Sequence, residues 1–114
     1  MRKWIICILA LAFVASPVAA AEVTVSGQLR DSFCFLTMGA HGPSHHDCAV
    51  ACAKAGIPVM LEQDNTSKYF VLMPPKDKQS LPASITDKME EKVTVTGHDY
   101  SKGGMTFLTV DSVK

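Results

Sequence analysis

Apolar and polar residues alternate in five short segments of this chain, and the alternation limits its fold to one built mainly of strands. A period of two is typical of a strand that buries one face and exposes the other. The segments that we expect to form strands are residues 22–30, 57–62, 68–73, 92–97 and 105–113. Turn-forming residues join the second segment to the third and the fourth to the fifth, which predicts two hairpins.

A long stretch without this alternation, residues 31–56, separates the first two segments. We interpret its first half, up to Pro43, as a loop. Ser44 then offers an N-cap, Asp47 suits the first turn of a helix, and a glycine and a proline follow some residues later. These signals predict a helix over residues 45–55.

The order of these elements is typical of the OB-fold, a five-stranded barrel with a short helix between its third and fourth strands. Residues 84–90, which follow a proline-rich stretch, are our candidate for that helix. We therefore expect a mainly β protein with short helices, in the form of a five-stranded, OB-fold-like antiparallel barrel. Residues 31–56 would form a loop-helix insert between strands 1 and 2, which a plain OB-fold lacks.

The first 21 residues have the three parts of a secretory signal peptide. Two basic residues are followed by the apolar run 4–14 and by a tail of small residues that ends in Ala20 and Ala21. A membrane-anchoring helix is the alternative, but the run is shorter than the roughly 20 residues that a bilayer requires. We expect cleavage near Ala20 or Ala21, a periplasmic or secreted protein, and no stable membrane anchor.

Removal of residues 1–21 leaves a single small domain of about 93 residues, 22–114. The leader holds two of the eleven basic side chains, so nine remain against eleven acidic ones and the net charge is −2 with neutral histidines. This balance lacks the basic footprint of a nucleic-acid-binding protein. The sequence also lacks a polybasic or amphipathic segment that would dock the domain on lipid.

Three cysteines remain after the leader, and two of them belong to a spacing that gathers metal ligands. His45, Cys48 and Cys52 occupy positions i, i+3 and i+7, which fall on one face of an α-helix. Cys34 lies on the preceding loop, which is long enough to fold back over this face. We predict that these four side chains form one metal site. Lesser candidate ligands are His41, His46 and Met38.

Two wider patterns surround these residues: Gly27-x-Leu29-x-Asp31-x-x-Cys34, and His45-x-x-Cys48-Ala49-x-x-Cys52-Ala53-x-x-Gly56-x-Pro58. They are similar to those of a family of small exported bacterial proteins with an OB-fold-like barrel and an inserted Cys/His loop-helix. The resemblance implies the fold and an exported setting. It implies no activity.

Thiolate and imidazole are the donors that the soft ion Cu(I) and the ion Zn(II) accept in proteins. Three cysteines and one histidine would complete a tetrahedral zinc site, whereas two or three thiolates suffice for Cu(I). We expect copper(I) in preference to zinc, because a solvent-reachable thiol site in an exported protein suits metal handling better than a permanent structural ion. Asp31 is a candidate for a supporting role, either as the hydrogen-bond partner of a ligating histidine or as the cap of a turn.

Two other functions stay open. In an oxidising compartment Cys34 could pair with Cys48 or Cys52 and staple the insert to the barrel, giving a binding module for which another periplasmic protein is a candidate partner. A bond between Cys48 and Cys52 is unfavourable on a regular helix. A thiol redox protein is the second alternative, although Cys-x-x-x-Cys differs from the Cys-x-x-Cys of thioredoxin-like enzymes. No motif joins a nucleophile, a base and oxyanion donors, so catalysis is not predicted.

Overall fold

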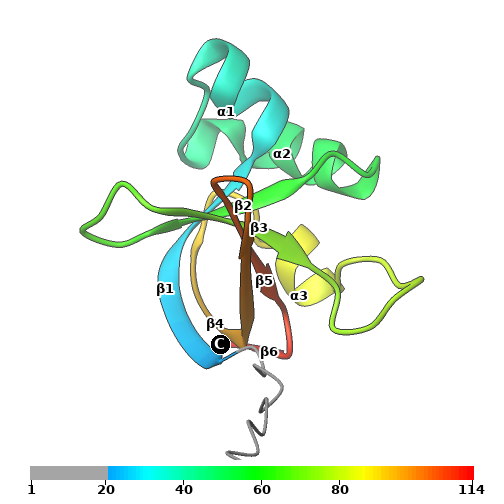
Figure 1. The fold of residues 1–114 in the computed structure, drawn as a ribbon. Helices are drawn as coiled ribbons and strands as arrows, with labels where there is room; N and C mark the ends of the chain where they lie inside the picture. Colours follow the sequence, from blue (N-terminus) through cyan, green and yellow to red (C-terminus); the bar gives the residue numbers. More distant parts are fainter. Residues whose placement is uncertain (1–20) are drawn as a thin grey trace, which may run out of the picture.

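The computed structural model describes residues 21–114 (Figure 1). The predicted signal peptide lies outside the described residues except for Ala21. The strands are β1 (Glu22–Asp31), β2 (Val59–Gln63), β3 (Tyr69–Met73), β4 (Lys92–Lys102), β5 (Met105–Thr109) and β6 (Ser112–Val113). The helices are α1 (Ser32–Met38), the 3₁₀ turn η1 (Pro43–His45), α2 (His46–Lys54) and α3 (Ala83–Thr86). Within this described range, no helix is long and apolar enough to cross a membrane.

The strands close into a barrel in the order β1, β2, β3, β5, β4, and β4 pairs again with β1. Every pair in the ring is antiparallel except β3 and β5, which run parallel. A closed ring of five strands must contain at least one parallel pair, because two opposite directions cannot alternate around an odd number of strands. The predicted OB-fold-like barrel with an insert after its first strand is confirmed, but the barrel is mixed and not antiparallel throughout.

β1 takes part in two pairings because it curves around the barrel. Its first part pairs with β4 and its second part with β2, and Gly27 belongs to both registers. A Cβ atom at Gly27 would lie 2.0 Å from the backbone oxygen of Glu62. Only glycine therefore allows β1 and β2 to approach so closely at this curve.

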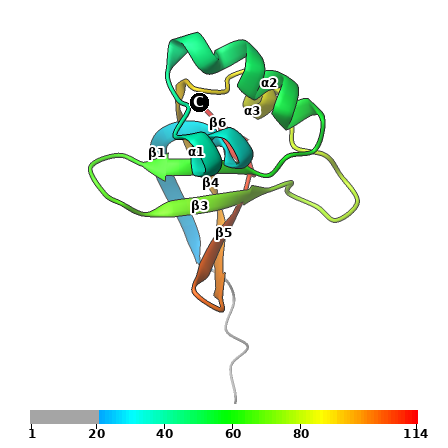
Figure 2. The same ribbon diagram turned by 90° about the horizontal axis from the view of Figure 1, so that it is seen from above.

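The barrel interior holds the apolar core. The strands contribute side chains that are almost fully buried, namely Val25, Leu29, Val59, Leu61, Phe70, Leu72, Val93, Val95 and Leu108. Burial of each large aliphatic side chain stabilises the fold by roughly 1.5–3 kcal/mol. α2 adds only Ala49 and Ala53 to this core, while Ile85 and Met89 come from α3 and the turn after it. These alanines bring the backbone of α2 close to the barrel, beside α3 (Figure 2).

The first half of the insert is helical, so its interpretation as a loop was wrong. α1 begins where a carboxylate oxygen of Asp31 accepts a hydrogen bond from the backbone N of Cys34 at 2.8 Å. It ends at Gly39, whose φ of 69° lies in the left-handed region that favours glycine. An aspartate N-cap and a glycine C-cap thus define this short helix.

The second half of the insert contains the predicted helix, with a different start. α2 corresponds to the expected residues 45–55, but the 3₁₀ turn η1 precedes it. Ser44 is not the N-cap that we expected, because this position belongs to His45, which makes no side-chain capping bond. The helix predicted at 84–90 is confined to α3 and the following turns, and the last predicted strand is divided into β5 and β6.

Candidate metal centre

α1 and α2 lie together over one end of the barrel (Figure 1), and the predicted ligands face each other between them. α1 carries Cys34, which is only 6% exposed. Phe35 fixes this helix to the barrel, since its ring lies 5.9 Å from the ring of Tyr69 and 5.5 Å from the guanidinium carbon of Arg30. The buried thiol therefore has a defined position relative to the strands.

η1 and α2 carry the other three predicted ligands. His45 is the last residue of η1, while Cys48 and Cys52 lie on α2 and so project from the same side of that helix. Cys48 is exposed and Cys52 is half-buried. The predicted ligands thus range from a buried thiol on α1 to a solvent-reachable thiol on α2.

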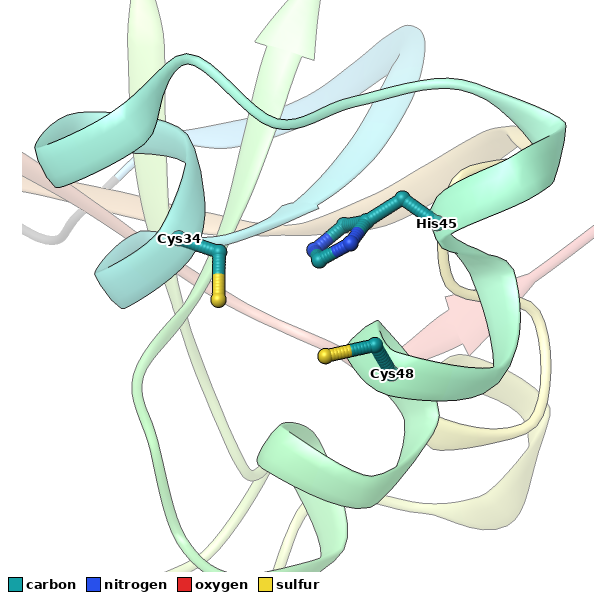
Figure 3. A group of neighbouring side chains, drawn as sticks. All are labelled: Cys34, His45 and Cys48. Atoms are coloured by element: carbon teal, nitrogen blue, oxygen red, sulfur yellow. The ribbon is translucent and has the colours of Figure 1, made fainter.

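The ligand atoms of these residues converge. Cys34 Sγ, Cys48 Sγ and a ring nitrogen of His45 lie within 4.8 Å of one another. Figure 3 shows both sulfurs and the imidazole pointing into the same space between the helices. The sulfurs of Cys34 and Cys52 form a second such group with a carboxylate oxygen of Asp31, also within 4.8 Å. The structure therefore brings together all four residues that the sequence singled out, and Cys34 is common to both groups.

Asp31 performs both of the supporting roles that we considered. One carboxylate oxygen caps α1 through Cys34 N, and the other, Oδ2, lies 2.7 Å from Nε2 of His45. An ionised carboxylate only accepts hydrogen bonds, so Nε2 of a neutral His45 carries the proton and Nδ1 keeps the free lone pair. Carboxylates commonly orient ligating histidines in this way. Because Asp31 is fully buried, its carboxylate has a fixed position, and the hydrogen bond to it orients the ring of His45.

The electrostatics of the centre oppose the addition of negative charge. Burial raises the pKa of the Cys34 thiol to about 12, and the charge of Asp31 and the neighbouring thiols add to this effect. Burial is also the main reason for the raised pKa of Cys52, followed by the charge of Asp31. The same surroundings favour a positive ion, whose charge would offset those of Asp31 and of thiolates. A metal ion would have to displace protons from these thiols.

The lesser candidate ligands lie outside the cluster. The His41 ring is bonded through Nδ1 to the carbonyl oxygen of Gly39 at 2.7 Å. His46 is bonded through Nδ1 to the carbonyl oxygen of Met89 at 2.6 Å. Met38 is largely exposed at the end of α1. Neither histidine belongs to a group of converging His, Cys, Asp or Glu ligand atoms in the described part of the chain.

Two buried charged residues beside the centre were missed by sequence reasoning. Arg30 donates to Glu62 at 3.0 Å and to Glu90 at 2.5 Å, and the Glu90 side chain is completely buried. Gly42 N also donates to Glu90, at 2.9 Å. No local pattern marks Glu90, because it meets Arg30 only when the barrel closes.

Cys34, Cys48 and Cys52 are all free, so none forms a disulfide in the described residues. Comparisons with protein-family models, curated proteins and solved structures found no match to this chain. The resemblance to small exported bacterial proteins with an inserted Cys/His loop-helix therefore stays a prediction.

Proposed function

We propose that this is an exported protein that binds one soft metal ion, copper(I) in preference to zinc(II), through Cys34, Cys48, Cys52 and His45. The observation that carries the proposal is the convergence of two sulfurs and an imidazole nitrogen within 4.8 Å. These atoms come from α1, η1 and α2, so the fold gathers them from separate elements.

The donor set decides the class of ion. Three thiols and one imidazole suit Cu(I) and Zn(II), and they suit hard ions such as Mg²⁺ and Ca²⁺ poorly. The hydrogen bond from His45 to Asp31 supports this assignment, because it leaves the other ring nitrogen available as a ligand.

The exposure of the ligands favours an exchangeable ion over a permanent structural one. Cys34 is buried against the barrel, whereas Cys48 opens to solvent and gives an ion a path of entry. The barrel already has an apolar core of its own, so it does not depend on a metal for its fold. Acquisition or delivery of copper in the periplasm, or after secretion, is the role that fits these properties.

Competition with a chromogenic Cu(I) chelator tests the proposal in the reduced, exported protein. We expect one ion per chain. Cys48→Ser or Cys52→Ser should abolish binding, and His45→Ala should weaken it. His98→Ala is the control: His98 lies on β4, where its ring is hydrogen-bonded to Asp111, and its replacement should leave binding unchanged. Failure of the reduced protein to take up either Cu(I) or Zn(II) would contradict the proposal.

A further inference from the structure

A second group of ligand atoms adjoins the thiols and contains no sulfur. One carboxylate oxygen each from Asp31 and Glu90 and a ring nitrogen of His45 lie within 4.8 Å of one another. The two acidic side chains are completely buried, although they are distant in sequence. Asp31 ends β1, and Glu90 lies just before β4.

Glu90 carries an oxygen that lacks a partner. Its Oε2 accepts from both Arg30 and Gly42 N, whereas Oε1 is buried with no hydrogen-bond partner among the described residues. A buried carboxylate oxygen without a partner is costly, and a bound cation is one of the few groups that can compensate it.

The charges around this group are also unbalanced, with more negative than positive side chains. Arg30 is the one buried cation that Glu90 meets, and it also serves Glu62. Asp31 has the ring of His45 and the Cys34 thiol as its ionisable side-chain partners, and neither is positively charged when the imidazole is neutral. With a neutral imidazole, the carboxylates of Asp31, Glu62 and Glu90 and the single guanidinium of Arg30 therefore leave an excess of two negative charges, which a divalent ion would neutralise.

We propose that Asp31, His45 and Glu90 form a second subsite, for a divalent cation of harder character than copper(I). One imidazole and two carboxylates suit Mn²⁺, Fe²⁺, Co²⁺ or Zn²⁺. The subsite needs no thiol, so it can be tested whether or not the thiols bind copper(I).

His45 couples this subsite to the thiols. A neutral imidazole has one lone pair for coordination, so its ring serves one ion at a time. An ion held by both Asp31 and His45 would replace the hydrogen bond from Nε2 to Asp31, and the ring proton would then lie on Nδ1. Where the thiols bind Cu(I) as proposed, an ion there and an ion between Asp31 and Glu90 compete for His45. The softness of the ion then determines which end of the cluster it occupies.

Mn²⁺ is a suitable probe because it favours oxygen donors and broadens nearby amide signals in ¹H–¹⁵N spectra. In the metal-free, reduced protein we expect the first amides to broaden to be those of Asp31, Gly42 and Glu90. Broadening centred on exposed acids such as Asp77, or none at all, would overturn the proposal. This measurement needs no variant and so does not depend on how a substitution folds.

A pair of variants tests the ligand itself. Glu90→Gln should lower Mn²⁺ affinity by about tenfold or more. Glu62→Gln is the matched control, because it removes the other carboxylate on Arg30 and should leave affinity within about twofold. Equal losses in both would overturn the proposal.

Removal of thiols separates this proposal from the copper function. Cys48→Ser/Cys52→Ser should keep Mn²⁺ binding, and loss of it would refute an independent subsite. Failure of Cu(I) binding in the wild type, with Mn²⁺ binding retained, would contradict the copper function alone.

Discussion

Asp31→Asn should separate the orientation of His45 from the integrity of the fold. The backbone N of Cys34 can only donate, so the Asn amide oxygen must turn toward it and keep the cap of α1. The amide NH₂ then faces Nε2 of His45, where the carboxylate oxygen lay at 2.7 Å. The ring must accept at Nε2 and carry its proton on Nδ1, which removes the lone pair available to a metal.

The geometry sets the expected magnitudes. A charge-assisted hydrogen bond is replaced by a neutral one while the cap survives, so the free energy of unfolding should fall by only about 1–2 kcal/mol. Metal affinity should fall as well, because the ring of His45 no longer offers its lone pair to the ion. Loss of the group that orients a ligating histidine typically costs about 10–100-fold.

Cu(I) affinity can be measured by chelator competition, stability by guanidinium unfolding followed by far-UV circular dichroism, and the tautomer by ¹⁵N shifts of the His45 ring. Asp111→Asn is the matched control, because Asp111 makes a similar bond, 2.8 Å long, to His98 on the surface. Unchanged Cu(I) affinity in Asp31→Asn, or an equal loss in Asp111→Asn, would refute the reasoning.

Three further predictions concern the thiols, the barrel and the leader. Because burial raises the pKa of Cys34 to about 12 and raises that of Cys52, these thiols stay protonated near neutrality. Zn(II) affinity should therefore rise with pH between pH 6 and 8, by about tenfold per unit for each proton displaced, and a flat titration profile would contradict this. Gly27→Ala would place Cβ 2.0 Å from a backbone oxygen of β2, so the free energy of unfolding, measured with denaturant, should fall by about 3 kcal/mol or more. Gly104→Ala, where a Cβ meets open space, should lower it by only about 1 kcal/mol. The intact mass of exported protein should show a chain that begins at Glu22 or one residue earlier, and retention of the leader would contradict the predicted localisation.

The order of the strands was predictable because alternation reports which face of a strand is buried. The helix α1 was missed although its two caps, Asp31 and Gly39, are visible in the sequence. Its short apolar and aromatic stretch gave no clear helical period, and the helix depends on an aspartate whose capping role becomes evident only with the fold. The parallel pair β3 and β5 was also missed, since it follows from closure of the ring and not from any local signal.

The cysteine and histidine ligands were predictable from their spacing, although the reason was only partly right. His45 was expected on the same regular helix as Cys48 and Cys52, whereas it ends the 3₁₀ turn before α2. Its ring still reaches Cys34 and Cys48 because Asp31 holds it there. Glu90 could not be predicted, since its neighbours are brought to it by pairings between distant segments.

The register of β1 explains why an acid lies beneath the insert. Side chains two apart share a face of a strand, so Asp31 continues the interior row of Val25 and Leu29, and all three are buried. Its pairing with Val59 of β2 fixes it at the end of the barrel that α1 and α2 cover. A buried carboxylate at a core position is unfavourable unless its oxygens find donors. The insert supplies both of them, Cys34 N and the ring of His45, so the acid and the helices over it each require the other.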